Sequence, residues 1–210
     1  MNTATTKAFV FTTWGLVGLT AVVMIVSAAF MPSSNEDAIG YMLRVTARLA
    51  FIFLMLAYMA QPLGQLVRSG IVHDTSRWLL KRRRHLGLSM ALAHTVHFGY
   101  VVALFVVLDM PLEWITIIFG GLAFVLMWLM AATSNSFSMV RLGKNWKRLH
   151  AFGLHYLWLI FMQSFIPRTF MDNMPLIYQV LVLVGLFGLG IRITSFLKLR
   201  SHRSNAESAF

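Results

Sequence analysis

The sequence predicts an all-α membrane protein, a bundle of six transmembrane helices with both termini on the cytoplasmic side. Of the 210 residues, 58% are hydrophobic and only 12% are charged, and the mean hydropathy is +0.71. This composition excludes an ordinary soluble domain. The apolar residues form six runs, each near the ~20 residues that cross a bilayer. The basic residues fall mostly between these runs, where they set the topology of a membrane protein.

The six predicted spans follow one another with short connections. They are Ala8–Phe30, Val45–Val67, Arg84–Leu108, Glu113–Ala132, Lys147–Ile166 and Leu176–Leu197. The first is longer than the apolar part of a signal peptide and lacks a small-residue cleavage site, so we expect it to be retained. Pro32, Pro111 and Pro167 mark connections on the outer side, and residues 201–210 form a polar tail.

The distribution of charge orients the predicted bundle. One side collects most of the basic residues: Lys7, Arg68, Arg77, Lys81, Arg82, Arg83, Arg84, Arg141, Lys144, Lys147, Arg148, Lys198, Arg200 and Arg203. The other side carries Arg44, Arg168, Glu36, Asp37, Asp109, Glu113 and Asp172. By the positive-inside rule the basic side is cytoplasmic, and an even number of spans returns both termini to it. The net charge of +11 therefore indicates topology and no nucleic-acid partner.

The sequence contains no cysteine. Disulfides, thiolate metal sites, Fe–S clusters and haem attached through cysteine are therefore excluded. Histidines inside the spans become the candidate functional residues, because ionisable side chains at membrane depth are costly and usually functional.

Two of the spans carry these histidines at matching depths. Spans three and five run in the same direction, so equal offsets from their cytoplasmic ends mean equal depths. His97 lies 13 residues past Arg84, and Gln163 lies 13 residues past His150. Each step is roughly 20 Å along a helix. This register sets Arg84 or His85 beside His150, and His97 beside Gln163.

Facing residues at these two depths, one near each side of the membrane, predict a haem site. Iron in a porphyrin takes axial ligands from opposite sides, and imidazole is a common donor. We expect His97 and His150 to be the leading ligands, with His85, His94 and His155 in reserve. His94 shares a helical face with His97, which favours a supporting role. The alternative is that each histidine only bonds to a neighbour in a packed bundle. That structural interpretation is favoured for His155, about 140° round the helix from His150.

Two arginines also call for a partner. Arg48 lies about one turn inside the outer end of span two, where a guanidinium is costly. We predict that the Arg48 guanidinium pairs with a haem propionate, and the alternative is that its side chain snorkels to lipid headgroups. The run from Lys81 to Arg84 is mainly a topology determinant, and Arg84 is a further candidate for a propionate or an anionic cofactor.

The segments that carry these residues resemble the ferric-reductase-like transmembrane family. They are most similar to its six-helix bacterial branch, the haem-binding subunits of periplasmic methionine sulfoxide reductase systems. The matching motifs are Thr46-Ala47-Arg48 with Pro62-Leu63, Arg83-Arg84-His85-Leu86-Gly87-Leu88 leading to His97, and Thr133-Ser134 followed by Arg141-Leu142-Gly143-Lys144-Asn145-Trp146-Lys147-Arg148-Leu149-His150. The resemblance implies one domain over residues 1–210, with its core at 45–166.

The resemblance also places the ligands. It implies that His97 and His150 stand at haem-ligand positions of the family. The family usually has a further histidine 13 residues after the position of His150, where this sequence has Gln163. The outer haem site is therefore lost, five-coordinate, or rebuilt with His94 or His155.

The function implied by the resemblance is electron transfer in the bacterial inner membrane through haem b, as one haem or two. The donor would be a cytoplasmic flavin reductase or a quinol, with quinone or FMN as a further cofactor. The acceptor would be a periplasmic oxidoreductase such as a molybdenum-dependent methionine sulfoxide reductase. Because the sequence contains no flavin or nicotinamide domain, we expect a redox subunit and not a complete enzyme.

Two other interpretations stay open. Gln163 favours a haem-free family member that acts as a structural or transport bundle, whereas the retained His97, His150 and Arg48 oppose it. A metal-ion or proton transporter is disfavoured, because no Asp or Glu is embedded in the membrane, away from the ends of the spans, to assist a cation path.

Overall fold

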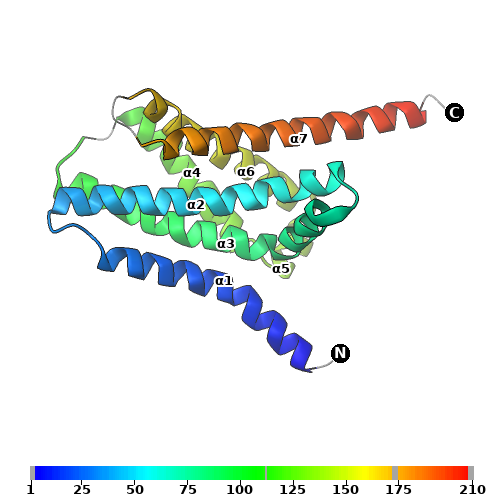
Figure 1. The fold of residues 1–210 in the computed structure, drawn as a ribbon, viewed down its shortest axis with the longest axis horizontal. Coiled ribbons are helices and arrows are strands. Elements are labelled where there is room, and N and C mark those ends of the chain that lie inside the picture. Colours follow the sequence, from blue (N-terminus) through cyan, green and yellow to red (C-terminus); the bar gives the residue numbers. More distant parts are fainter. Residues whose placement is uncertain (1–2, 112, 172–174, 208–210) are drawn as a thin grey trace. The chain divides into compact units, whose positions relative to one another are not determined.

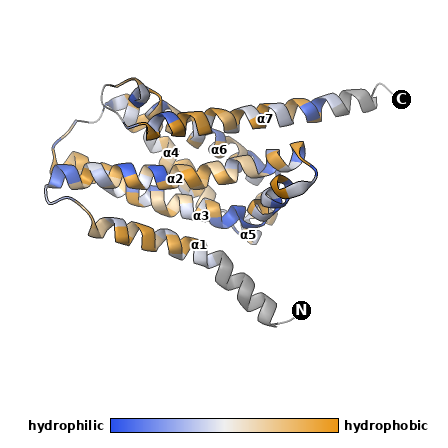
Figure 2. Ribbon diagram, in the orientation of Figure 1, coloured by the Kyte–Doolittle hydropathy of each residue, from blue (hydrophilic) through white to orange (hydrophobic). Residues whose placement is uncertain are grey.

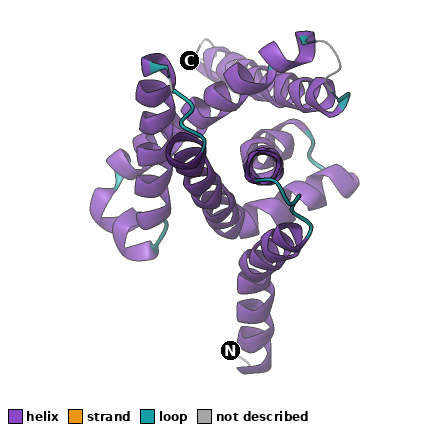
Figure 3. Ribbon diagram, turned by 90° about the vertical axis from the view of Figure 1, so that its left-hand side faces the viewer, coloured by secondary structure: helices purple, strands orange, loops and turns teal. Residues whose placement is uncertain are grey.

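The computed structural model describes residues 3–111, 113–171 and 175–207, with side chains at 14–111, 113–171 and 175–201. All regular elements within these ranges are helices joined by short loops (Figures 1 and 3). They are α1 (Thr3–Ala29), α2 (Asn35–Leu66), α3 (Gly70–Val107), α4 (Trp114–Ala132), α5 (Ser136–Leu142), α6 (Lys144–Phe165), the 3₁₀ helix η1 (Pro167–Phe170) and α7 (Ile177–Glu207). The predicted all-α class is confirmed. The side chains of Lys7, Asp172 and Arg203, used above for orientation, lie outside the described residues.

Five helical segments are long and apolar enough to cross a membrane. They are Asn35–Leu66, Gly70–Val107, Trp114–Ala132, Lys144–Phe170 and Ile177–Ser201. The described part of α1, Trp14–Ala29, is a shorter apolar helix. Hydrophobic residues run along most of these segments (Figure 2). They indicate a multi-pass membrane protein in contact with lipid, whereas the sixth span and the position of the termini stay predictions.

The helix α2 begins ten residues before the predicted span at Val45. The backbone N–H of Asp37 donates to the Ser34 hydroxyl at 3.1 Å, and that hydroxyl donates to the Asp37 carboxylate at 2.6 Å. The first of these bonds is an N-cap, in which a side-chain oxygen satisfies a backbone N–H at the start of a helix, and the second holds the Ser34 hydroxyl in place. The segment after Pro32, which the sequence predicts as a turn, therefore starts α2.

Two further differences concern the basic connections. The helix α3 begins at Gly70, so the Lys81–Arg84 run lies inside a helix and not in a loop. Lys and Arg have high helix propensity, so a charged connection can continue the helix of the span that follows. The short α5 was not predicted. The Asn135 side chain caps it by accepting from the Ser138 N–H at 2.7 Å.

The chain divides into two compact units. The first comprises residues 1–54 and 84–160, which include α1, α4, α5 and parts of α2, α3 and α6. The second comprises residues 55–83 and 161–210, which include η1, α7 and the remaining parts of α2, α3 and α6. The predicted single domain over 1–210 stays a prediction.

Aromatic and polar contacts hold α3, α4 and α6 together within the first unit. The Phe98 and Trp128 rings meet edge to face at 5.3 Å, and the Trp128 indole N–H donates to the Thr95 hydroxyl at 3.0 Å. The Tyr156 hydroxyl donates to the Phe119 carbonyl at 3.0 Å. These contacts join α3 to α4 and α4 to α6, and so fix the helices that carry most of the candidate histidines.

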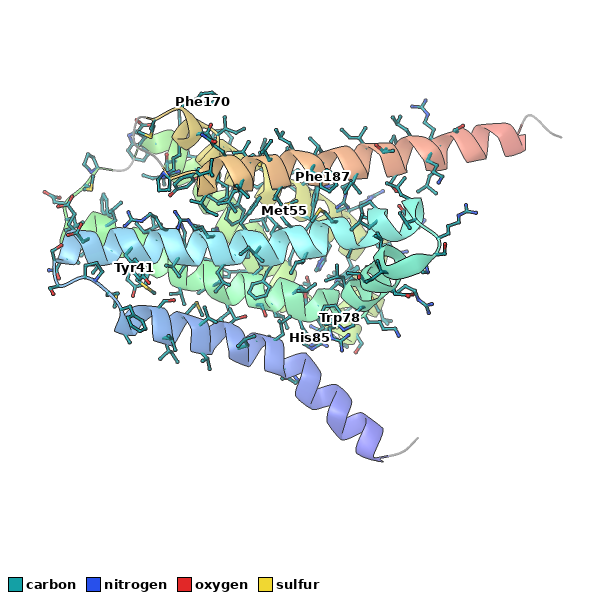
Figure 4. All side chains as sticks on the ribbon, viewed as in Figure 1. Tyr41, Met55, Trp78, His85, Phe170 and Phe187 are labelled. Atoms are coloured by element: carbon teal, nitrogen blue, oxygen red, sulfur yellow. The ribbon has the colours of Figure 1, made fainter. Side chains whose placement is uncertain are left out.

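In the second unit, α7 packs on residues 55–66 of α2 through a stripe at spacings of three and four. The buried members of this stripe are Tyr178, Leu181, Gly185, Gly188 and Ser195. Small residues on such a stripe let two helix backbones approach closely. At Gly188, an added Cβ would meet Met55 and lie 3.4 Å from Met59. Phe187, on the outer side of α7, is exposed (Figure 4).

The close approach of α2 and α3 at Gly64 leads to a testable expectation. A Cβ added at Gly64 would lie 2.5 Å from the Ser76 hydroxyl oxygen, which donates to the Ala60 carbonyl at 2.6 Å. We expect Gly64→Ala to break this buried hydrogen bond and to destabilise the protein by about 1–3 kcal/mol, despite the higher helix propensity of alanine.

The matched control for this variant is Gly190→Ala, where an added Cβ meets nothing within 4 Å. Thermal unfolding followed by tryptophan fluorescence should give a lower melting temperature for Gly64→Ala only. Equal melting temperatures for the two variants would contradict the expectation.

Candidate functional site

His97 lies on α3 in the first unit and contacts Thr46 on α2. The Thr46 hydroxyl is 2.6 Å from the Met42 carbonyl and 3.1 Å from Nδ1 of His97. A hydroxyl has one proton, and the carbonyl can only accept, so the Thr46 proton goes to Met42. Thr46 therefore accepts from His97, which places the imidazole proton on Nδ1 and the lone pair on Nε2. A metal-bound histidine usually has this arrangement, with its second nitrogen donating to a fixed acceptor.

His94 is buried, and it stacks on His97. Their ring centroids are 5.0 Å apart with the planes parallel within 1°, and the Phe124 ring stacks on His94 at 4.7 Å. Axial ligands of one haem stand on opposite faces of the macrocycle, whereas these two rings project from neighbouring turns of one helix. The two rings therefore lie side by side on α3, and the supporting role expected of His94 stays a prediction.

His150 lies near the start of α6 and is held by α4. Its Nε2 is 3.2 Å from the Thr133 hydroxyl, and that hydroxyl donates to the Leu129 carbonyl at 2.7 Å. By the same proton count, His150 donates from Nε2 and has its lone pair on Nδ1. Trp146 stacks on the His150 ring at 4.1 Å and donates its indole N–H to the Thr133 carbonyl at 2.9 Å. The two leading histidines thus differ in which nitrogen can bind a metal.

The other histidines of the candidate site occupy separate places. His85 on α3 is half-buried and meets Trp14 of α1 edge to face at 5.8 Å (Figure 4). His155 on α6 is exposed, and its Nδ1 lies 2.7 Å from the Ala151 carbonyl one turn back. The structural role favoured for His155 stays a prediction. Among the described residues, no three or more His, Asp or Glu side chains gather into a metal-binding group.

The remaining candidates are Arg48, Arg84 and Gln163. Arg48 is half-buried on α2, two residues beyond Thr46. Arg84 is exposed on α3, and Gln163 is exposed on the part of α6 that belongs to the second unit. The expected pairs of His97 with Gln163, of Arg84 or His85 with His150, and of Arg48 with a propionate stay predictions.

The second unit holds a polar cluster that the sequence reasoning missed. Pro62 lies inside α2 and has no N–H, so the carbonyl four residues earlier, that of Tyr58, lacks its helical donor. The Arg192 guanidinium on α7 donates to this carbonyl at 3.0 Å and lies 4.4 Å from the centre of the Tyr58 ring. One turn further, the Ser195 hydroxyl donates to the Gln65 side-chain oxygen at 2.5 Å.

A signal for this cluster was present in the sequence. Arg192 is a charged residue within a predicted apolar span, which by itself asks for a partner. Thr46 had no such signal. It belongs to the Thr46-Ala47-Arg48 motif, but its contact with His97, 51 positions away, exists only in the folded chain.

No protein-family model matches the sequence, and no solved structure matches the fold. The resemblance to the ferric-reductase-like transmembrane family therefore stays a prediction.

Proposed function

We propose that the chain is an inner-membrane electron-transfer protein that binds b-type haem, with six transmembrane helices and both termini in the cytoplasm. The observation that carries the proposal is the Thr46–His97 contact, which puts the lone pair of a membrane-embedded imidazole on Nε2. Haem bound there would supply an iron that accepts and releases one electron at a time. The distribution of basic residues along the sequence supports the orientation.

Each residue of the first unit has a definite role in this proposal. His97 would hold the haem iron, and Thr46 fixes the tautomer and ring orientation of that imidazole. His94 packs against the His97 ring and restricts its rotation. Arg48, on the same helix as Thr46, would neutralise a propionate. His150 would be the second residue to hold the iron, and with its Nε2 bonded to Thr133 it would do so through Nδ1.

The redox partners in this proposal are those that the resemblance implies. Electrons would come from a quinol or from a cytoplasmic flavin reductase, with quinone or FMN as the intermediate carrier. The acceptor is a periplasmic oxidoreductase, of which a molybdenum-dependent methionine sulfoxide reductase is the expected example.

One pair of observations favours a second candidate, a haem-free bundle with a structural or transport role. Gln163 replaces an expected imidazole and is exposed, and His150 already has a hydrogen-bond partner in Thr133 for its Nε2. Both features are what a bundle without haem would show. Haem content distinguishes the two candidates.

The test is the haem content of the purified full-length protein, measured by the pyridine haemochrome method. We expect about one haem per chain or more in the wild type, and loss of most of it in His97→Ala/His150→Ala. The control is His73→Ala, because His73 lies in the second unit, where its Nδ1 contacts the Val67 carbonyl at 3.0 Å. A wild type without haem, or a double variant with full haem content, would favour the haem-free bundle.

A further inference from the structure

The first part of α3, from Gly70 to Arg83, has a surface that the proposed function does not use. We call it the basic segment. It carries Arg77, Lys81, Arg82 and Arg83 against a single acid, Asp74. From the sequence alone, these charged residues are expected in a loop that sets the topology. Because the segment is helical, its charges are arranged on defined faces.

One face of the basic segment is fixed to α2 within the second unit. Ser76 and Leu79 are buried, and the Ser76 hydroxyl donates to the Ala60 carbonyl at 2.6 Å. His73, one turn earlier, contacts the Val67 carbonyl at 3.0 Å. These contacts attach the segment to the end of α2, so the opposite faces are presented outward.

A second face is apolar and exposed. Trp78, labelled in Figure 4, is 49% exposed, and Ile71 is 81% exposed. Their separation of seven residues places them on one side of the helix. The Arg82 guanidinium, one turn beyond Trp78, lies 4.2 Å from the centre of the indole ring. A tryptophan beside a cationic group is the combination found where helices meet lipid headgroups.

The third face is cationic. Arg77 and Lys81 are both exposed and one turn apart, and they border the Trp78 face on one side. Beyond Arg83 the same helix continues into an apolar stretch that is long enough to span a membrane. Covalent continuity therefore keeps the cationic face close to a bilayer surface, where anionic headgroups attract clusters of Lys and Arg.

We propose that the basic segment is a binding site for anionic phospholipid headgroups. Arg77, Lys81 and Arg82 hold the lipid phosphate, while Trp78 and Ile71 enter the boundary between headgroups and acyl chains. Charge complementarity selects anionic over zwitterionic lipid, since both offer the same acyl chains to the apolar face. The site depends on the assignment to a membrane and does not depend on haem.

The test uses the full-length protein in vesicles of phosphatidylcholine and phosphatidylglycerol, with one of the two lipids brominated at a time. Bromine quenches nearby indoles, and the part due to Trp78 is the difference between the wild type and Trp78→Phe. At equal lipid fractions, we expect brominated phosphatidylglycerol to quench Trp78 at least about twofold more than brominated phosphatidylcholine, and high salt to reduce the ratio. Equal quenching by the two lipids in the wild type would overturn the proposal.

Two sets of substitutions locate the site. Arg77→Gln/Lys81→Gln/Arg82→Gln should bring the quenching ratio to about one, because the headgroup ligands are gone. A matched control, Arg141→Gln/Lys144→Gln/Arg148→Gln, removes the same charge from the first unit and should leave the ratio unchanged. If both triple variants reduce the ratio equally, overall charge and not this segment selects the lipid, and the proposal fails. If the basic-segment variant does not fold, Lys81→Gln alone should reduce the ratio.

Discussion

Replacing Arg192 by methionine is expected to destabilise the protein by about 1.5–3 kcal/mol when Pro62 is present, and by much less when Pro62 is replaced by alanine. With proline at position 62, the Tyr58 carbonyl loses the N–H four residues on, and the Arg192 guanidinium donates to it instead. Methionine keeps the length and apolar character of the side chain but removes its donors. A buried carbonyl then loses its hydrogen bond in an apolar surrounding.

In Pro62→Ala, the new N–H of residue 62 donates to the Tyr58 carbonyl as in any helix, so the same Arg192 substitution removes a dispensable bond. Thermal unfolding of the four proteins forms a double-mutant cycle, and we expect a coupling of about 1 kcal/mol or more. Arg200→Met, an exposed arginine on the same helix, is the matched control and should cost little. An equal cost of Arg192→Met in both backgrounds would show that Arg192 does not replace the bond that Pro62 removes.

Replacing Thr46 by valine is expected to weaken haem binding by on the order of tenfold to a hundredfold, if His97 is an axial ligand. Valine has nearly the same shape as threonine but cannot accept from the His97 Nδ1–H. The imidazole becomes less electron-rich and its ring orientation less fixed. Since an electron-rich ligand stabilises ferric iron, we also expect the midpoint potential to rise in Thr46→Val.

The conservative variant separates this role from simple packing. Thr46→Ser keeps the hydroxyl and should retain both the haem affinity and the potential of the wild type. Haem titration and a redox titration followed by absorbance measure both quantities. A Thr46→Val protein with unchanged affinity and potential would mean that the Thr46–His97 contact only packs two helices together.

The fold class could be predicted from hydropathy alone, whereas several helix ends could not. The limits of α4 agree closely with the predicted span, because its apolar run ends at polar residues, Glu113 and Thr133. α2 and α3 begin earlier than predicted. Hydropathy reports where apolar side chains begin, but a helix continues as long as its backbone hydrogen bonds and caps allow. The N-cap at Ser34 and the helical Lys81–Arg84 run are both of this kind.

A residue of the candidate site could be predicted where its own side chain is costly at membrane depth, whatever its neighbours are. An imidazole at membrane depth identifies His97 without knowledge of any neighbour. Its tautomer is set by Thr46 from another helix, which no spacing in the sequence reveals. His150 shows the converse, because its motif predicts a ligand whereas its Nε2 contacts Thr133 in the fold. Arg192, a charged residue within a predicted apolar span, is a similar local signal, and it indicates a polar partner on a neighbouring helix.

The most direct test of the account is the dithionite-reduced minus oxidised absorption spectrum of His97→Gly, recorded with and without added imidazole. If His97 supplies an axial nitrogen to haem iron, the variant should lose the wild-type bands, and imidazole entering the vacated space should restore them. His155→Gly, which removes an exposed imidazole from α6, should keep the wild-type spectrum. A His97→Gly spectrum identical to that of the wild type would contradict the account.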